Sequence, residues 1–341
     1  MRKILWLMPN KAYNKTGIYK YNYELIKVLK STRNIDIKYC GLSDNYLETF
    51  FSKFIILPIY LIILSIKYDC IVYPEEGFAF LKLFSLSKKN KIIIHDYRYE
   101  FNRYLNLKLK EKLKQSFLNF NFLFLKNFTK IIVPSKFTKN ILIKNFNKLN
   151  IKKIIIIPNI IEIKKSNYKG LGNKFKILKK IKKNSKIILT ISSSESRKNI
   201  ELIFKLSNIN KKLNFVLIGN FKKKLHSNIY IFENLTELEL SKIYDISDIY
   251  FDTSLYEGFG RTTIEAQNFK LPVVCFNTES NKEILEDTCH FIKKSDSLEK
   301  IIKKLINLKI SSKDKNKIFK NANRYSSKKV QSKYKLNINE I

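Results

Sequence analysis

The chain has 341 residues and a formal net charge of +37, from 66 Lys and Arg against 29 Asp and Glu. At roughly 100–200 residues per domain, this length predicts two domains. Hydrophobic residues make up 45% of the chain, which excludes a disordered polybasic tail. Four cysteines without C-x-x-C spacing exclude a disulfide scaffold and favour a reducing, cytoplasmic compartment.

Composition bias accounts for most of the positive charge. The basic residues are 59 Lys and 7 Arg, and 51 Ile stand against 4 Ala, a pattern typical of an AT-rich genome. The charge is also even, with +18 in residues 1–163 and +19 in the remainder. A nucleic-acid-binding protein more often concentrates its charge on one face and uses Arg, so we expect no nucleic acid partner. An anionic membrane surface fits better, because Lys suffices for that attraction.

The first half of the chain alternates short apolar runs with longer amphipathic ones. The expected strands are residues 3–8, 35–40, 70–73, 91–95, 130–134 and 153–157. The expected helices are residues 19–30, 50–66 and 104–127, and one that Ser135 caps. Continuous Ile-rich strands are typical of parallel sheets covered by helices on both faces, and the alternation predicts a doubly wound α/β domain.

Residues 50–66 form the most apolar stretch of the chain. Lys53, Pro58 and Ser65 interrupt it, and it is shorter than the ~20 residues that a membrane span needs. We expect a buried helix here, and a helix resting on a lipid surface is the alternative. The apolar run at residues 4–8 is too short for the core of a signal peptide, so we expect a buried strand.

Residues 164–186 are the expected domain junction, since they hold ten Lys and no acidic residue. The alternation then restarts, with expected strands at 186–191, 214–218, 229–232, 249–252 and 272–276. The expected helices are 199–206, one that a Thr236/Glu239 capping box opens, 261–268, 281–286, 298–308 and 313–324. The sequence therefore predicts two tandem α/β domains, residues 1–162 and 163–341, with the last helix able to pack back on the first. Ligands bind such sheets at the carboxyl ends of the strands, here in a cleft between the domains.

A glycine-containing loop before the helix at 261–268 carries the clearest chemical signal. Gly258 and Gly260 let backbone N–H groups turn outward, and the helix N-terminus adds partial positive charge, which together predict a phosphate site. Arg261 is a cation where acids are usual, so we expect it to meet an external anion. Glu257 and Glu265, eight residues apart, can face one cleft and accept hydrogen bonds from sugar or ribose hydroxyls, although Glu265 could also form a surface salt bridge.

This run resembles the signature of the GT-B-fold, retaining glycosyltransferases of family 4, often called glycosyl transferases group 1. The matching residues are Glu257-Gly258-Phe259-Gly260, Glu265-Ala266 and Pro272-Val273-Val274. Weaker matches occur along the chain in the same order as in the family. They are Gly17, His95-Asp96, Val133-Pro134-Ser135, Ile157-Pro158-Asn159, Arg197-Lys198-Asn199 and Ile218-Gly219. The resemblance implies two Rossmann-like doubly wound domains facing a central cleft. It also implies transfer of a sugar from a nucleotide-diphosphate sugar with retention of anomeric configuration.

The resemblance implies a role for each matching residue. The catalytic residues would be Glu257 on the donor sugar's hydroxyls, Lys198 on the diphosphate and His95 near the sugar and acceptor. The donor-binding residues would be Glu265 on the ribose, the amides of Gly258, Phe259 and Gly260, Gly17 beside the diphosphate, and the cations Arg197 and Arg261. Many relatives have Gly-Arg where this chain has Ser192-Ser193, so one diphosphate cation is missing.

We expect no cofactor and no metal, since the three His are scattered and no D-x-D motif is present. The expected partners are a UDP- or GDP-sugar donor, a glycan or lipid-linked acceptor and an anionic membrane surface, at the cytoplasmic face of the inner membrane. Residues 82–139, beside the apolar stretch, carry 14 basic and 3 acidic residues, which fits that location. Adjacent Glu75 and Glu76 are expected in a solvated loop, with an acceptor-facing position as the alternative. The alternative functions are a nucleotide-sugar epimerase or phosphorylase of the same fold, or a catalytically weak relative that binds polyanions or membranes.

Overall fold

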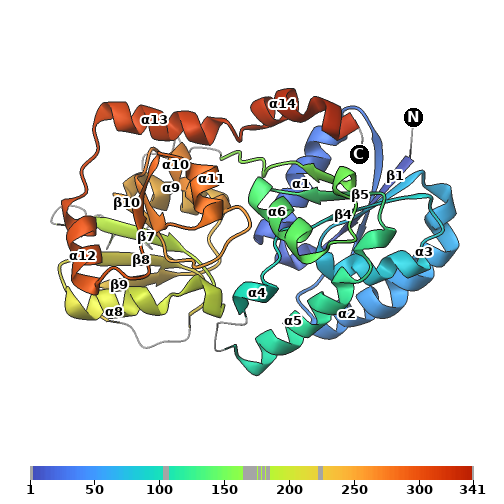
Figure 1. Ribbon diagram of the computed structural model, residues 1–341. Helices are drawn as coiled ribbons and strands as arrows, with labels where there is room; N and C mark the ends of the chain where they lie inside the picture. Colours follow the sequence, from blue (N-terminus) through green and yellow to red (C-terminus); the bar gives the residue numbers. More distant parts are fainter. Residues whose placement is uncertain are drawn as a thin grey trace. The chain divides into compact units, whose positions relative to one another are not determined.

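The computed structural model describes residues 3–102, 107–163, 185–221 and 226–339, together with residues 175, 178 and 181. The chain divides into two compact units (Figure 1). Unit 1 comprises Met1–Glu100, Leu107–Ile160 and Ser327–Ile341, and unit 2 comprises Phe101–Asn106 and Ile161–Ser326. The Lys-rich junction expected over residues 164–186 lies mostly outside the described residues.

Unit 1 is built on a six-stranded parallel sheet in the order β2-β1-β3-β4-β5-β6. Its strands are β1 (Lys3–Met8), β2 (Asn34–Tyr39), β3 (Cys70–Tyr73), β4 (Lys89–Ile93), β5 (Lys130–Val133) and β6 (Ile154–Ile156). All six were expected from apolar runs, and the strand expected at 91–95 begins two residues earlier. His95 therefore lies in the loop after β4, at the carboxyl edge of the sheet.

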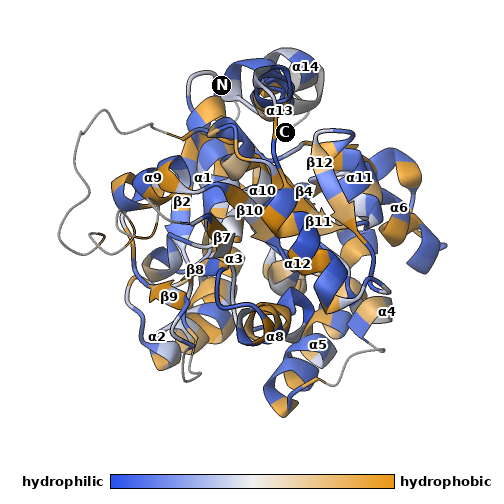
Figure 2. Ribbon diagram, turned by 90° about the vertical axis from the view of Figure 1, so that its left-hand side faces the viewer, coloured by the Kyte–Doolittle hydropathy of each residue, from blue (hydrophilic) through white to orange (hydrophobic). Residues whose placement is uncertain are grey.

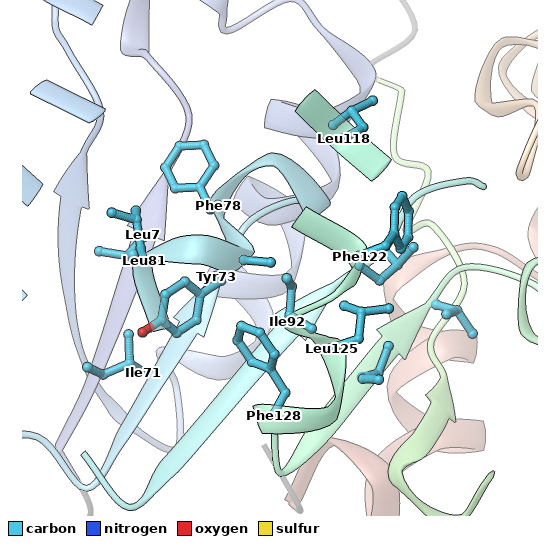
Figure 3. Close-up of a cluster of buried hydrophobic side chains, with 14 of the residues drawn as sticks. Leu7, Ile71, Tyr73, Phe78, Leu81, Ile92, Leu118, Phe122, Leu125 and Phe128 are labelled. Atoms are coloured by element: carbon cyan, nitrogen blue, oxygen red, sulfur yellow. The ribbon is translucent and has the colours of Figure 1, made fainter. Parts of the chain in front are cut away.

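Two apolar cores cover the two faces of this sheet. Side chains alternate along β1, so Leu5 and Leu7 enter one core while Ile4, Trp6 and Met8 enter the other. Figure 3 shows the first core, where Phe78, Phe122 and Phe128 gather around the strands. Both faces are covered, which is why the strands read as continuous apolar runs.

The helix α6 of unit 1 begins at its predicted cap. Ser135 Oγ accepts a hydrogen bond from the Thr138 N–H at 3.0 Å, as expected for the start of α6. The helix expected over 104–127 is shorter, because α5 covers only Leu109–Phe122. The helical elements are α1 (Gly17–Leu29), α2 (Tyr46–Phe51), the π-helical turn η2 (Ser52–Ile56), α3 (Leu57–Leu64), the 3₁₀ segment η4 (Glu76–Phe84), α4 (Tyr99–Asn102), α5, α6 (Lys136–Asn145) and α14 (Ser327–Asn339), with short 3₁₀ turns η1 (Lys11–Tyr13), η3 (Ser65–Lys67), η5 (Leu125–Asn127) and η6 (Ile151–Lys153).

The apolar stretch expected to be a buried helix is mostly exposed. It forms one helical segment, Tyr46–Lys67, of 22 residues, which is long and apolar enough to cross a membrane by length and composition. Only 28% of its most apolar window is buried. Leu57, Pro58 and Leu61 face the core, whereas Ile59 and Ile63 are 52% and 65% exposed. The expectation of a buried helix is therefore wrong.

Unit 2 is built on a second six-stranded parallel sheet, in the order β12-β11-β10-β7-β8-β9. Its strands are β7 (Ile187–Ile191), β8 (Asn214–Ile218), β9 (Ile229–Phe232), β10 (Ile249–Asp252), β11 (Val273–Phe276) and β12 (Cys289–Ile292). Five of these were expected. The edge strand β12 was not, because its short, partly exposed sequence lacks the Ile-rich run that marks the central strands.

The helices of unit 2 follow the expected alternation. They are η8 (Ser196–Lys198), α8 (Glu201–Ile209), α9 (Glu237–Ile246), α10 (Arg261–Asn268), α11 (Glu279–Leu285), α12 (Leu298–Asn307) and α13 (Ser312–Asn323). The capping box at α9 is confirmed, since Glu239 N–H donates to Thr236 Oγ1 at 3.2 Å and Thr236 N–H donates to Glu239 Oε2 at 2.8 Å.

Chain order in this sheet reverses between β7 and β10, which are hydrogen-bonded neighbours. In a doubly wound sheet this reversal is the switch point, where the loops after the two strands diverge and leave room for a ligand. The loops that follow β7 and β10 are the segments with the group 1 resemblance.

Candidate active site

Two hydrogen bonds join the two loops at the switch point of unit 2. The loop after β7 leads into η8, and the loop after β10 leads into α10. Leu255 N–H donates to the Arg197 carbonyl at 2.9 Å, and Thr253 Oγ1 donates to the Lys198 carbonyl at 2.7 Å. These bonds fix the backbone of Arg197 and Lys198 against the loop that carries Glu257.

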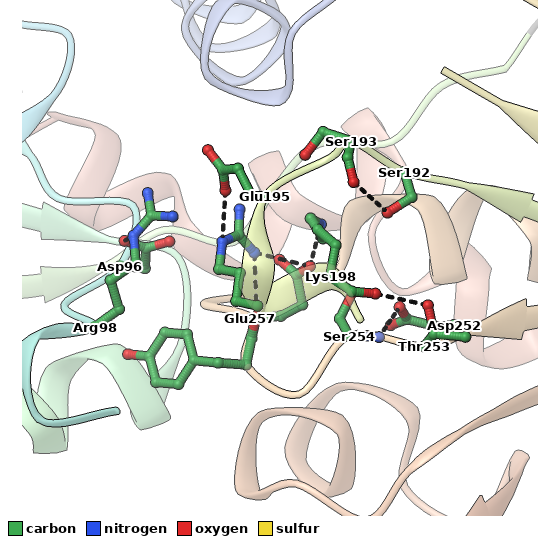
Figure 4. Close-up of polar contacts among 12 residues, drawn as sticks. Asp96, Arg98, Ser192, Ser193, Glu195, Lys198, Asp252, Thr253, Ser254 and Glu257 are labelled. Atoms are coloured by element: carbon green, nitrogen blue, oxygen red, sulfur yellow. Dashed lines mark hydrogen bonds and ion pairs between the residues drawn. The ribbon is translucent and has the colours of Figure 1, made fainter. Parts of the chain in front are cut away.

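Glu257 is the centre of an ion-pair cluster (Figure 4). Its Oε1 forms ion pairs with Lys198 Nζ and with Arg197 Nη1, the latter at 3.1 Å. Arg197 Nε lies 2.8 Å from Glu195 Oε2. Burial would raise the pKa of Glu257, but Lys198 and Arg197 outweigh it and lower that pKa to about 2. Glu257 is therefore an ionised hydrogen-bond acceptor at neutral pH.

The formal charges of this cluster cancel, because two cations face the carboxylates of Glu195 and Glu257. An anion that binds here must therefore either take a cation away from its carboxylate or contact a cation that keeps its carboxylate partner. Lys198 is suited to that change, since a flexible ammonium can reorient while the Arg197 fork stays between Glu195 and Glu257.

Asp252 is a neighbouring acid that the sequence reasoning missed. It ends β10 and is buried, and its Oδ1 accepts a hydrogen bond from Ser254 N–H at 3.0 Å. Burial, followed by the nearby charge of Glu257, raises the pKa of Asp252. One feature of the sequence could have indicated Asp252 as a site residue. It is an acid at the last position of an apolar strand, and ligands bind at that carboxyl edge of the sheet.

The loop Gly258-Phe259-Gly260 is anchored by its middle residue. The Phe259 ring is buried and meets the Tyr325 ring edge-on, with centroids 5.1 Å apart. Gly260 has φ +80°, a left-handed conformation that suits glycine, and its carbonyl accepts from Thr263 Oγ1 at 2.6 Å. Gly260 is also the N-cap of α10 and has no side chain to satisfy the first-turn N–H groups, which favours an anion there.

Arg261 and Glu265 meet each other on α10. Arg261 Nε lies 2.9 Å from Glu265 Oε1, and Tyr244 OH donates to Glu265 Oε2 at 3.1 Å. Arg261 was expected to pair with an anion outside the chain. Its partner in the structure is instead the Glu265 carboxylate, in the same helix. Glu265 is 5% exposed, so the alternative of a surface salt bridge is wrong.

A close contact between two backbones positions the loop after β7. This is the loop in which Ser192-Ser193 stands where many relatives have Gly-Arg. Gly219, after β8, has φ +146°, and a Cβ there would lie 2.1 Å from the Ser192 carbonyl oxygen. Only glycine fits this contact. Ser193 is exposed at the same loop and supplies no cation.

The remaining predicted site residues lie in unit 1. His95 follows β4, and its Nε2 lies 3.0 Å from the Pro74 carbonyl while Tyr21 packs edge-on at 5.1 Å. Burial lowers the pKa of His95, so the ring is neutral at neutral pH. Gly17 begins α1, and a Cβ there would meet nothing within 4 Å, so internal packing does not require glycine. The structure brings Arg197, Lys198 and Glu257 into one ion-pair cluster and pairs Arg261 with Glu265. Gly258, Phe259 and Gly260 lie between Glu257 and Arg261 in the chain, also in unit 2, whereas Gly17 and His95 belong to unit 1.

Glu76 differs from its expected place in a solvated loop. It is 4% exposed, and its Oε2 has no hydrogen-bond partner among the described residues. Burial raises its pKa to about 8, with Asp96 and Glu75 adding to the effect. Glu75 Oε1 lies 4.0 Å from Nζ of the partly buried Lys53. No group of three His, Cys, Asp or Glu in the described ranges could hold a metal ion.

Comparison with solved structures shows the class of fold. The chain superposes on Anabaena Alr3699/HepE in complex with UDP-glucose at a TM-score of 0.74 and 14% identity, covering 100% of both chains. It matches sucrose-phosphate synthase from Thermosynechococcus elongatus at a TM-score of 0.74 and 12% identity, over 100% of this chain and 97% of that one. A glycosyltransferase from Rickettsia africae ESF-5 gives 0.64 and 19%, over 99% and 98%. The predicted GT-B fold class is confirmed.

One family model matches the chain within unit 2. Residues 173–325 match the model described as glycosyl transferases group 1. No curated protein matches the sequence significantly.

Proposed function

We propose that the protein transfers a sugar from a nucleotide-diphosphate sugar to an acceptor hydroxyl, with retention of anomeric configuration, as in glycosyltransferase family 4. The observation that carries the proposal is the cluster of Lys198 and Arg197 on Glu257, beside the N-terminus of α10, whose N-cap is a glycine. A cation, helix N-terminal N–H groups and an ionised carboxylate suit the diphosphate and the hydroxyls of one donor.

The chemistry requires a nucleoside diphosphate to depart. The bond from the sugar's anomeric carbon to the phosphate oxygen breaks, the acceptor oxygen bonds to that carbon, and the acceptor's proton passes to the leaving phosphate. Lys198, the amides of Gly258, Phe259 and Gly260 and the dipole of α10 oppose the charge that grows on the phosphate. Glu257 is a poor nucleophile because two cations hold its carboxylate, so we propose attack on the same face as the leaving group.

Other residues take supporting roles in this proposal. Glu265 binds the ribose. This role requires that the Glu265 carboxylate, while paired with Arg261, keep one lone pair available to the ligand. His95 and Gly17, in unit 1, serve the acceptor and the diphosphate. We propose a UDP- or GDP-sugar as donor and a glycan or lipid-linked acceptor, without a cofactor or a metal. The Cys40 and Cys275 thiols are buried and form no disulfide bond, which supports a cytoplasmic protein.

A donor panel tests this function. Purified protein is incubated with UDP-, GDP-, ADP- and dTDP-sugars, with and without EDTA and a mixture of lipid-linked and soluble glycan acceptors, and nucleoside diphosphate release is measured. We expect release from a UDP- or GDP-sugar that depends on acceptor and survives EDTA. Epimerisation without acceptor, or a requirement for free phosphate, would instead assign an epimerase or a phosphorylase. Tight polyanion binding without response to any donor would indicate a catalytically weak relative.

A further inference from the structure

The helical segment Tyr46–Lys67 presents an apolar face that the rest of unit 1 leaves uncovered. Ile59, Ile62, Ile63 and Ile66 are 52%, 52%, 65% and 73% exposed. Single exposed apolar residues are ordinary, but soluble proteins rarely expose a contiguous patch larger than about 300–600 Å². These four residues follow one another at helical spacing, so they form a continuous ridge.

The opposite side of the same segment is fixed in the fold. Leu57 and Leu61 are fully buried in the core of unit 1, and Ser65 Oγ accepts a hydrogen bond from Leu86 N–H at 2.9 Å. A helix that crossed a bilayer would have to strip Leu57 and Leu61 from that core. The segment therefore suits a position in the plane of an interface, with its inner side on the protein.

Neighbouring elements enlarge the apolar ridge. Leu83 on η4 and Leu86 just after it are 62% and 63% exposed, and the hydrogen bond between Leu86 and Ser65 places them beside the end of the segment. On the other side, the Phe54 ring packs edge-on against Phe117 of α5 at 5.8 Å. The segment η4 contacts both α3 and α5 in unit 1. We define the docking face as Ile59, Ile62, Ile63, Ile66, Leu83 and Leu86.

Exposed lysines border the docking face. Lys67 follows Ile66 directly, and Lys88 and Lys89 follow Leu86 by two and three residues. On α5, Lys110 and Lys112 are exposed, as are Leu109 and Leu113. Figure 2 shows hydrophilic and hydrophobic residues following one another along this helix. An apolar centre with a cationic border matches the acyl chains and headgroups of an anionic lipid surface.

We propose that the docking face binds an anionic lipid bilayer in an interfacial orientation. The charge decides between this occupant and a second copy of the chain. Two copies would bring the same lysines together in a chain of net charge +37, whereas anionic lipid supplies both the apolar phase and the opposite charge. The proposal does not depend on transferase activity, so either can fail without the other.

Vesicle co-sedimentation of the full chain tests the proposal. Vesicles of phosphatidylglycerol with phosphatidylcholine should bind the protein, and vesicles of phosphatidylcholine alone should bind it at least about tenfold more weakly. I59Q/I63Q removes the apolar contribution and K88E/K89E the charge contribution, and each should weaken binding by tenfold or more. The control L238Q/I306Q changes two exposed apolar residues of unit 2 and should bind as the parent does.

Two further measurements make the outcome decisive. Because Ile59 and Ile63 are exposed, I59Q/I63Q should keep the parent's circular dichroism and melting temperature, so lost binding is not unfolding. A fluorophore attached at I63C should shift to shorter wavelength on anionic vesicles, which adsorption through lysines elsewhere does not produce. Absent binding at low salt, equal binding by I59Q/I63Q, or a lipid-free dimer that I59Q/I63Q dissociates would each overturn the proposal.

Discussion

In the proposed transfer, Lys198 supplies the cation that a departing diphosphate needs, and in the structure it faces Glu257. Lys198→Ala should lower kcat/KM by on the order of 10²-fold or more, because it removes a charge that opposes the developing negative charge. Steady-state kinetics on the best donor of the panel measure the effect. Lys211→Ala, at an exposed turn of the same unit, is the control and should match the parent. Unchanged turnover in Lys198→Ala would remove Lys198 from the mechanism.

Glu76 should make stability depend on pH. Its pKa in the folded protein is about 8, above the ordinary value of 4.5, so its contribution is fully present below about pH 4.5 and is lost as pH rises through 8. The side chain in the Glu76→Gln variant cannot ionise. The free energy of unfolding of the variant minus that of the parent should therefore increase from pH 5 to pH 9. Between the two pKa values this increase is up to about 1.4 kcal/mol for each pH unit.

Urea denaturation at the two pH values measures this difference. Glu233→Gln, at an exposed position in unit 2, is the control and should show a much smaller pH dependence relative to the parent. An equal response from both variants would mean that Glu76 is not the group that titrates.

At the scale of elements, the ends of β7 and β8 depend on one glycine. Gly219→Ala would place a Cβ 2.1 Å from the Ser192 carbonyl at a φ of +146°. The loops after β7 and β8 must then move apart, and the start of η8 moves with them. We expect this to lower the free energy of unfolding by about 1–3 kcal/mol. We expect a lower melting temperature together with weaker donor binding.

Gly17→Ala is the matched comparison, because a Cβ there meets nothing within 4 Å and the residue begins a helix, where Ala is favourable. Its melting temperature should stay equal to the parent's or rise slightly. If Gly219→Ala melts as the parent does, the backbone approach at Ser192 is not a constraint on the fold.

The segment Tyr46–Lys67 shows where element-level reasoning from sequence stopped. Apolar residues around the whole circumference of a helix usually indicate burial, which led to the wrong expectation. The sequence showed the helix but not that η4 and α5 pack beside it and leave one side open. The edge strand β12 was missed for a different reason, since it is short and partly exposed and has no Ile-rich run.

At the scale of the whole molecule, the +37 charge should work against compactness. Like charges repel one another less when salt screens them, and the Debye length falls from about 10 Å at 0.1 M to about 3 Å at 1 M ionic strength. Melting temperature should therefore rise between about 0.05 M and about 0.5 M NaCl. Sucrose at equal osmolality is the control for solvent effects unrelated to charge, and should give a smaller rise. A fall in melting temperature with NaCl would show that attractive ion pairs outweigh the repulsion.

The sequence by itself determined the architecture and marked the candidate site. Apolar runs predicted every described strand of the two sheets except β12, because a strand buried on both faces must be apolar throughout. The E-G-F-G loop and the Arg197-Lys198 pair marked the candidate donor site, because both are short segments whose meaning is local.

Tertiary structure alone decided which charges meet and which surfaces stay open. It paired Glu257 with two cations, buried Glu76 and left the docking face uncovered. The physical reason is that ion pairing and burial depend on atoms brought close by strand order and helix packing. A pattern read along the chain records what a residue is, whereas its environment depends on neighbours that are tens of residues away.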